Sequence, residues 1–283
     1  MTYFLNFRTK GVGGAVVDPY LLEGDGTEVP PAVSVVDAGL MPSIFAGKNV
    51  LFAAHGFNVD YQDGACELGQ LDQYLDLPAP SLFVGVLWPG DCWLPVVDYP
   101  FEGDVSIDTG GRLAAFCNQY CTSAQSLSFV SHSLGARVVL EAVSRLARQA
   151  RSVCLTAGAI NRDCLTSEYA TAAGNAERIS ILASDEDMVL KVAFTVGDPL
   201  ADLLHSDHSA FQAALGSLGP SLPLPKDVNY PWQIPDDLDY GHHDYLPPSP
   251  AVPLPPPPNT KWTSAADFMK RAFLGQSQTW PIG

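Results

Sequence analysis

The segment Leu127–Gly135 (LSFVSHSLG) places a serine between two small residues at a sharp turn. An apolar strand signal ends at Ser131, and a helical run begins at Ala136. This order of strand, turn and helix predicts that the Ser133 hydroxyl stands at the tip of the turn as a nucleophile. The N–H of Leu134 would then lie at a helix N-terminus, where it can stabilise a developing oxyanion. The alternative is a Ser/Gly-rich turn in an ordinary strand–helix unit.

A second pattern follows an earlier apolar run. Residues Asn49–Ala54 are bounded by turn residues, as expected for a strand buried on both faces of a parallel sheet. His55 and Gly56 come directly after this run. Glycine permits a close approach of the backbone, so the N–H of Phe57 is expected to point at the same oxyanion. The two patterns together predict an oxyanion hole formed by the N–H groups of Phe57 and Leu134.

Three segments resemble a known family in the same order along the chain. His55–Val59 (HGFNV), Leu87–Gly90 (LWPG) and Ser131–Val138 (SHSLGARV) are similar to motifs of bacterial α/β-hydrolases related to lipases and esterases. Those proteins read HGFNV, Trp-Pro-small and AHSMGNRV. The resemblance covers roughly Lys48 to Leu190. It implies an α/β-hydrolase fold, which is a mostly parallel, doubly wound sheet flanked by helices, and a Ser-Asp-His triad, but it names no substrate.

The triad needs an acid after the serine in the chain. The predicted strand Ile179–Ala183 is followed by Asp185 and Asp187. The loop after this strand is where the fold commonly carries its acid, and the family pattern Ser-x-x-Asp-x-x-Leu registers on Asp187. Asp185 is the second choice and Asp163 the third. The acid would accept the imidazole N–H and fix its tautomer.

The base must come later than the acid, which leaves His242 and His243. The family's base is followed closely by a tyrosine, and either histidine fits that pattern. His242 is slightly favoured because Gly241 permits a tight approach, but both stay candidates. The other four histidines either come too early or belong to the motifs above, where their contribution is positional: His205, His208, His55 and His132.

Alternating strand and helix patterns predict a parallel sheet with its site at the carboxyl ends of the strands. An N-terminal hairpin is expected to pair Tyr3–Arg8 with Ala15–Val17. Strands are expected near Asn49–Ala54, Ser81–Trp88, Leu127–Ser131, Val153–Ala157 and Ile179–Ala183. Helices are expected near Asp63–Tyr74, Ser106–Tyr120, Ala136–Ala150, Ser167–Asn175 and Asp187–Phe194.

Composition suits one globular α/β-hydrolase domain over residues 1–283, with N-terminal strands and a loop over 1–47. Residues 247–258 read as an extended Pro-rich strap that carries a final helix (264–274) back onto the domain. The net charge of −16 argues against binding nucleic acid or an anionic membrane. With neither a convincing signal peptide nor a membrane-spanning run, a soluble cytoplasmic protein is expected. The six cysteines form no metal pattern and read as core thiols.

Specificity has weaker signals. Trp88 and Trp93 are expected to contact substrate, and the apolar loop Trp93–Phe101 is expected to line a pocket, act as a lid or pack on the sheet rim. With Phe57 and Leu246 nearby in topology, an apolar acyl or aryl group is favoured.

The sequence therefore predicts a serine esterase that uses water and needs neither cofactor nor metal. Neutral esters are favoured, because no basic residue is placed to hold a charged substrate. A thioesterase, an amidase or a polyester depolymerase would use the same machinery. A catalytically silent binding protein with this fold is the alternative of a different class.

Overall fold

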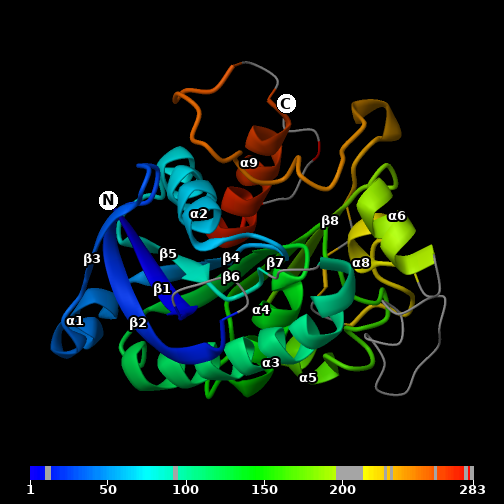
Figure 1. Ribbon diagram of the computed structural model, residues 1–283. Helices are drawn as coiled ribbons and strands as arrows, with labels where there is room; N and C mark the ends of the chain where they lie inside the picture. The colour runs from blue at the N-terminus through cyan, green and yellow to red at the C-terminus, as the bar shows by residue number, and fades with distance from the viewer. Residues whose placement is uncertain are drawn as a thin grey trace.

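A nine-stranded sheet forms the centre of the protein in the computed structural model (Figure 1). The structure describes residues 1–9, 14–91, 95–195, 213–225, 228–229, 232–257, 260–276 and 280. The strands are β1 (Thr2–Arg8), β2 (Val16–Asp25), β3 (Ala32–Val35), β4 (Asn49–Ala54), β5 (Ser81–Leu87), β6 (Ser126–His132), β7 (Ser152–Thr156), β8 (Ile179–Ala183) and β9 (Trp232–Gln233). Their order across the sheet is β3-β2-β1-β5-β4-β6-β7-β8-β9.

The pairings from β1 across the sheet to β9 are all parallel, and at the other edge β2 pairs antiparallel with both β1 and β3, so β2 alone runs against the other strands. The five core strands predicted from the sequence are present, and each of their ends lies within one residue of the prediction. The N-terminal hairpin is present as well, with a second strand that continues to Asp25. The α/β-hydrolase architecture expected from the sequence is thus confirmed.

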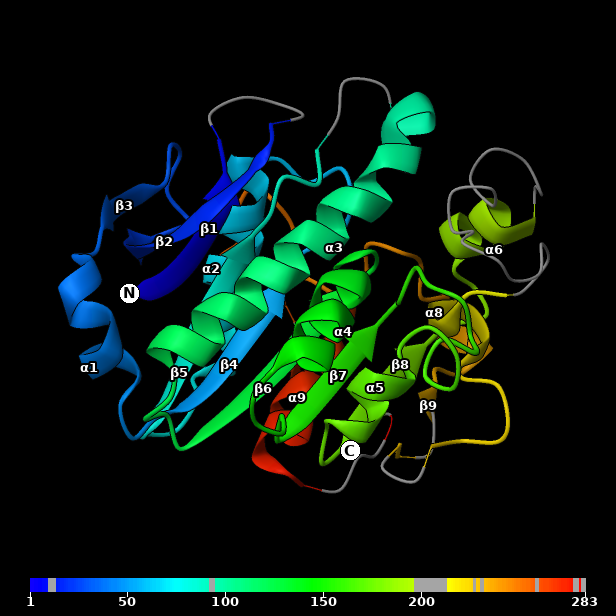
Figure 2. The same ribbon diagram turned by 90° about the horizontal axis from the view of Figure 1, so that it is seen from below.

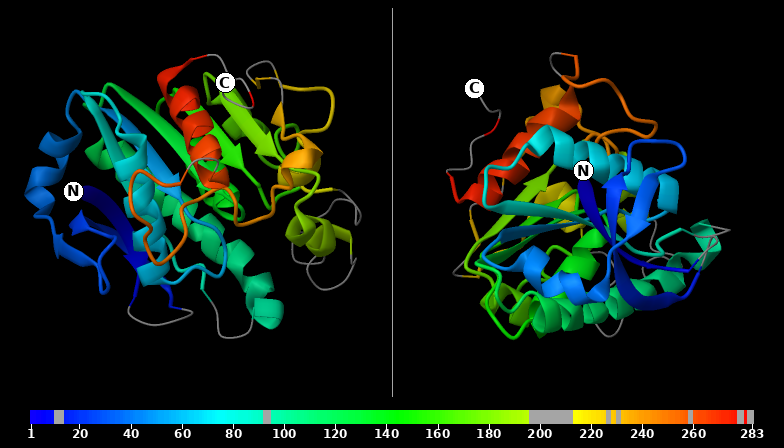
Figure 3. Two further views of the ribbon diagram at one scale, coloured as in Figure 1. Left: turned by 90° about the horizontal axis from the view of Figure 1, so that it is seen from above. Right: turned by 90° about the vertical axis from the view of Figure 1, so that its left-hand side faces the viewer.

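Helices cover both faces of the sheet. They are α1 (Met41–Phe45), α2 (Tyr61–Leu75), α3 (Pro95–Tyr120), α4 (Gly135–Arg145), α5 (Ala170–Gly174), α6 (Met188–Thr195), α8 (Leu215–Leu218) and α9 (Lys261–Leu274), with 3₁₀ turns η1 (Ala38–Leu40) and η2 (Asp236–Leu238). Helices α3, α4 and α5 lie on one face (Figure 2), and α2 and α9 lie on the other (Figure 3). No helix among the described residues is long and apolar enough to cross a bilayer.

The central strands β4 and β6 set the position of the site. Both are almost entirely buried, and the rings of Phe52 and Phe129 stack at the centre with their centroids 5.5 Å apart. Their register pairs Phe52 with Phe129 and Ala54 with Ser131. Parallel neighbours in this register end at the same edge of the sheet. The segments that begin at His55 and His132 therefore emerge side by side.

Four expectations about helices need correction. Helix α4 ends at Arg145 rather than Ala150, because Leu146 is extended, and α5 begins at Ala170 rather than Ser167. Helix α3 begins at Pro95, so most of the predicted loop Trp93–Phe101 is helical; Trp93 and Leu94 lie outside the described residues. Proline has no backbone N–H, but the N–H groups in the first turn of a helix have no intrahelical acceptor in any case. Pro95 is therefore compatible with the start of the helix. The last helix begins at Lys261, three residues earlier than predicted. Residues 247–257 form neither helix nor strand, as the Pro-rich composition led us to expect.

We predict that Gly135→Ala destabilises the protein. A Cβ atom at this position would lie 2.5 Å from the carbonyl oxygen of His55 and 2.9 Å from that of Ala54, so backbone must move. Such overpacking costs about 1–3 kcal/mol, which urea unfolding would detect. The control is Gly174→Ala, where a Cβ meets nothing within 4 Å. Equal stabilities of the two variants would contradict the close approach of β4 and α4.

Candidate active site

The turn between β6 and α4 has the geometry of a nucleophile elbow. Ser133 adopts φ +53°, a left-handed conformation that is strained for a residue with a side chain, by about 1–3 kcal/mol. Two hydrogen bonds hold this conformation: the Ser133 N–H donates to the carbonyl of Thr156 at 3.1 Å, and the Ala159 N–H donates to the carbonyl of Ser133 at 3.2 Å. A strained residue that the surrounding backbone supports in this way marks a functional position.

Gly56 permits the segment after β4 to contact the elbow. A Cβ atom on Gly56 would lie 2.9 Å from Nδ1 of His132 and 3.0 Å from Cβ of Ser133. Any side chain here would push the two segments apart. The backbone that carries Phe57 is therefore adjacent to Ser133. Leu134 is the N-cap residue of α4, so its N–H belongs to the first turn, where amides lack intrahelical acceptors.

The structure brings three of the predicted residues into a chain of hydrogen bonds. Oγ of Ser133 lies 2.8 Å from Nε2 of His242, and Nδ1 of His242 lies 2.8 Å from Oδ2 of Asp187. Because a carboxylate accepts, Nδ1 carries the proton and donates it to Asp187, which leaves Nε2 to accept from the Ser133 hydroxyl. This tautomer is the one a general base requires.

Asp187 is held in place by the start of α6. Its side chain is fully buried, and its second oxygen, Oδ1, accepts the N–H of Leu190 at 3.0 Å. Asp185, the second choice from the sequence, instead pairs with Lys191 at 3.4 Å on the surface. Asp163, the third choice, lies in a turn where its carbonyl accepts from Thr166. Of the three carboxylates, Asp187 is therefore the one that contacts His242.

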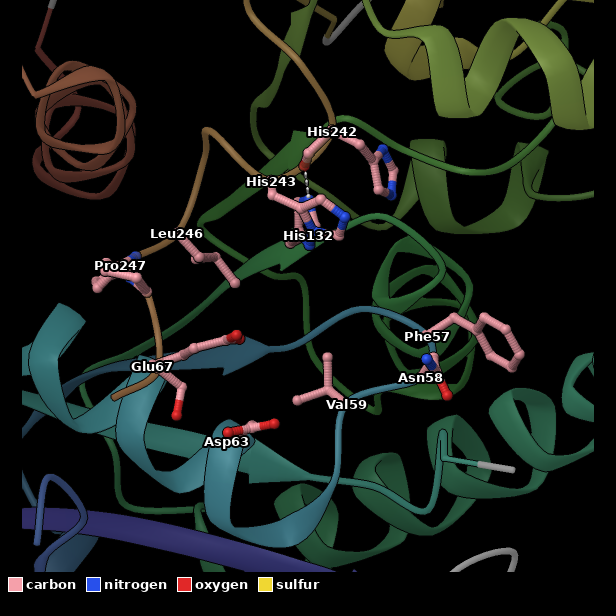
Figure 4. Close-up of a pocket in the computed structure, with 12 residues that line it drawn as sticks. Phe57, Asn58, Val59, Asp63, Glu67, His132, His242, His243, Leu246 and Pro247 are labelled. Atoms are coloured by element: carbon pink, nitrogen blue, oxygen red, sulfur yellow. Dashed lines mark hydrogen bonds between the residues drawn. The ribbon is translucent and has the colours of Figure 1, made fainter. Parts of the chain in front are cut away.

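The segment that carries His242 is fixed from two sides. His132 Nε2–H donates to the main-chain carbonyl of His242 at 2.7 Å (Figure 4). Nζ of Lys261 lies 3.0 Å from Oδ2 of Asp244, and the same oxygen accepts the N–H of Gly241 at 2.8 Å. The contact of Lys261 crosses from α9 to the loop and has no local sequence pattern, so sequence reasoning missed it. His243, in contrast, is exposed, with its ring centroid 5.6 Å from that of His242.

His55 is a buried support for the strand ends. Trp88 N–H donates to His55 Nε2 at 3.3 Å, so Nδ1 carries the proton and donates to the carbonyl of Gly56 at 2.9 Å. The indole N–H of Trp88 donates to the carbonyl of His55 at 2.9 Å, and the two rings stack. Burial, reinforced by the nearby charge of Arg8, lowers the pKa of His55 to about 3. His55 is thus a neutral structural histidine.

Trp88 does not occupy the position expected of a substrate contact. It is fully buried against His55 and is not among the residues that line the cavity described below. The apolar character that suggested a pocket serves core packing instead. Trp93, the other predicted substrate contact, lies outside the described residues, as do His205 and His208.

A buried ion pair beneath the loops was not foreseen from the sequence. Arg8 pairs with Asp91, and both side chains are more than nine-tenths buried. Arg8 Nη1 also donates to the carbonyls of Trp88 at 2.9 Å and Val59 at 3.0 Å. A buried charge needs such partners, because removing it from water costs several kcal/mol. Arg8 thereby ties β1 to the segments that follow β4 and β5.

A cavity of about 330 Å³ lies beside His242 (Figure 4). Its walls come from the segment after β4, from α2, from His132 and from the chain around His242. The lining residues are Phe57, Asn58, Val59, Asp63, Glu67, His132, His242, His243, Leu246, Pro247, Pro248 and Ser249. Across the described part of the chain, no group of three or more His, Cys, Asp or Glu residues is arranged to hold a metal ion.

Comparisons with known proteins agree with this architecture. The family described as "Alpha/beta hydrolase of unknown function (DUF900)" matches residues 43–209, and a comparison with curated proteins found no match. The protein is thus an α/β-hydrolase by fold and by sequence. Because the match spans more than half of the chain, the chain belongs to this DUF900 family.

Solved structures give more distant similarities. Esterase PE8 is 17% identical, with a TM-score of 0.44 over 80% of this chain and 94% of that one. Acetyl xylan esterase 1 from Thermoanaerobacterium sp. JW/SL YS485 is 11% identical, with a TM-score of 0.45 over 96% and 87% of the two chains. The ydeN gene product from B. subtilis is 15% identical, with a TM-score of 0.34 over 58% and 88%. Similarities at this level define neither the substrate nor the reaction of this chain.

We predict that acid destabilises the protein through His55. The pKa of His55 is about 3 in the folded protein and about 6.5 in the unfolded chain. The contribution of neutral His55 to the free energy of unfolding is therefore fully present above pH 6.5 and is lost as the pH falls toward 3. At pH 5 the loss from this one residue is about 2 kcal/mol. Urea unfolding of wild type and His55→Gln at pH 7 and pH 5 measures it. An identical pH dependence of both proteins would refute the neutral buried state of His55.

Proposed function

We propose that the protein is a serine hydrolase that cleaves carboxylic esters. Ser133 is the nucleophile, His242 the general base and Asp187 the acid that orients it. The N–H groups of Phe57 and Leu134 form the oxyanion hole. The observation that carries this proposal is the chain of two 2.8 Å hydrogen bonds from Ser133 through His242 to Asp187. We also propose that residues 1–283 act as one catalytic domain, which the single nine-stranded sheet supports.

In this mechanism, Oγ of Ser133 attacks the ester carbonyl while Nε2 of His242 takes its proton. The tetrahedral oxyanion is stabilised by the two backbone N–H groups at the strand ends. His242 then donates its proton to the leaving alcohol, which departs and leaves an acyl group on Ser133. Water, activated by the same histidine, hydrolyses this intermediate and restores the enzyme. Asp187 stabilises the imidazolium in both steps. No step of the proposed mechanism needs a cofactor or metal.

Thioesters, amides and polyesters also contain an acyl carbonyl carbon that Ser133 could attack. These substrates and the silent binding protein therefore become outcomes of the test. Esters expel a better leaving group than amides do, so ester cleavage makes the smaller demand on proton donation by the base.

The direct test is hydrolysis of p-nitrophenyl acetate, butyrate and octanoate by the wild type and by Ser133→Ala. We expect turnover by the wild type and a loss of about 10⁶-fold in the variant, as for other serine nucleophiles. Circular dichroism confirms that the variant is folded. The same pair of proteins is assayed on a thioester, an amide and a polyester: activity on one of these alone would redirect the proposal to that class, and a folded wild type inactive on all substrates would favour the silent binding protein. Undiminished activity of Ser133→Ala would overturn the proposal.

The matched pair His242→Ala and His243→Ala tests the base. We expect His242→Ala to lower kcat/KM by at least about 10⁴-fold, because Ser133 then loses its proton acceptor. The exposed neighbour His243 makes no hydrogen bond to Ser133 or Asp187 in the described structure, so we expect its variant to stay within a few-fold of wild type. Similar losses in both variants would contradict the assignment of the base.

A further inference from the structure

The cavity beside His242 is placed to receive the leaving group of an ester. Two of its lining residues, Phe57 and His242, belong to the proposed machinery, and His242 is the residue that contacts the Ser133 hydroxyl. His242 hands its proton to the leaving oxygen, so the alcohol must lie on the side of that ring. A volume of about 330 Å³ is at the lower end of ligand pockets. The cavity therefore suits a small alcohol.

The walls of this cavity are held in position by buried hydrogen bonds. Gln70, on α2, is 1% exposed. Its Nε2 donates to the carbonyl of Pro248 at 3.0 Å, and its Oε1 accepts the N–H of Val252 at 3.1 Å. One side chain thus fixes the Pro-rich segment against the helix that forms the opposite wall. A wall fixed before binding lowers the ordering cost when a ligand enters.

The wall formed by α2 is acidic. Asp63 and Glu67 lie one turn apart on this helix and line the same cavity, and Figure 4 shows them across from His243 and Leu246. None of the lining residues that the structure describes is Lys or Arg. The titratable groups around Glu67 are Asp63 and Cys66 on its own helix, Asp60 at the N-cap of that helix, His242 and His243 on the facing loop, and His132 on β6.

The surroundings of Glu67 disfavour its ionised form, and no positively charged side chain among the lining residues offsets this. Burial, followed by the charges of Asp63 and Asp60, raises the pKa of Glu67 to about 8. A neutral ligand would leave the ionised form of Glu67 as unfavourable as it is in the empty cavity. A ligand with a positive charge would stabilise the ionised form, because opposite charges in a partly buried site attract strongly.

We propose that this cavity binds a cationic group, so that the preferred substrates are esters of short alcohols that carry a positively charged nitrogen. Glu67 is the specificity-determining residue and Asp63 supports it. The substrate class rests on the ester hydrolase function proposed above, whereas the binding of a cation does not. Cationic esters thus replace the neutral esters favoured in the sequence analysis. The sequence alone did not indicate that Asp63 and Glu67 lie near the site.

Binding tests the proposal without turnover. The probes are choline and 3,3-dimethylbutan-1-ol, which share a shape and differ in charge, titrated by calorimetry into the full chain. We expect choline to bind about tenfold more tightly, and more tightly at pH 9 than at pH 7, because Glu67 ionises between these values. Glu67→Gln should lose the preference and its pH dependence. Asp63→Asn should weaken the preference, and Glu28→Gln, which removes an exposed charge elsewhere, should keep it.

Equal binding of the two probes, or an unchanged preference in Glu67→Gln, overturns the cationic subsite. Turnover of choline acetate and 3,3-dimethylbutyl acetate separates this proposal from the esterase proposal. Equal hydrolysis of both esters would leave the esterase standing and overturn the subsite. Choline binding through Glu67 without hydrolysis of either ester would support the subsite and contradict the esterase.

Discussion

The close approach of two backbone segments at the end of the central strands is the constraint on which the site depends. Gly56 and Gly135 leave no room for a side chain between the segment after β4 and the elbow after β6. This contact sets where the Phe57 backbone lies relative to Ser133, and so whether two N–H groups can face one oxyanion. Packing of β4 on β6 creates the contact, because their register ends both strands at the same edge.

Polar contacts, most of them buried, then fix the loops at this edge of the sheet. The Arg8–Asp91 pair and the His55–Trp88 contacts hold the chain after β4 and β5, while His132 and Lys261 hold the loop of His242. Each buried group is costly to remove from water unless it is partnered. The protein therefore uses polar residues beneath the site for position, and keeps the carboxylates of α2 on a cavity wall, where a ligand can meet them.

Sequence patterns predicted what is local. The strands, the turn at Ser133 and the close approach of Gly56 to that turn follow from neighbouring residues, and the position of Asp187 agrees with a short family motif. The choice between His242 and His243 does not, because it depends on which ring meets Ser133 after the loop folds back. The position of Trp88 depends on a partner 33 residues away, and the contacts of Lys261 and Gln70 join elements far apart in the chain. Helix α3 was misread because its prolines resemble those of a loop.

The central claim is that Ser133 is an activated nucleophile, and covalent labelling by a fluorophosphonate tests it most directly. Peptide mass spectrometry of the labelled protein would locate the adduct, with His242→Ala as the matched variant. We expect one phosphonylated residue, Ser133, in the wild type, and a loss of labelling in His242→Ala. A folded protein that does not react, or an adduct at another residue, would contradict it.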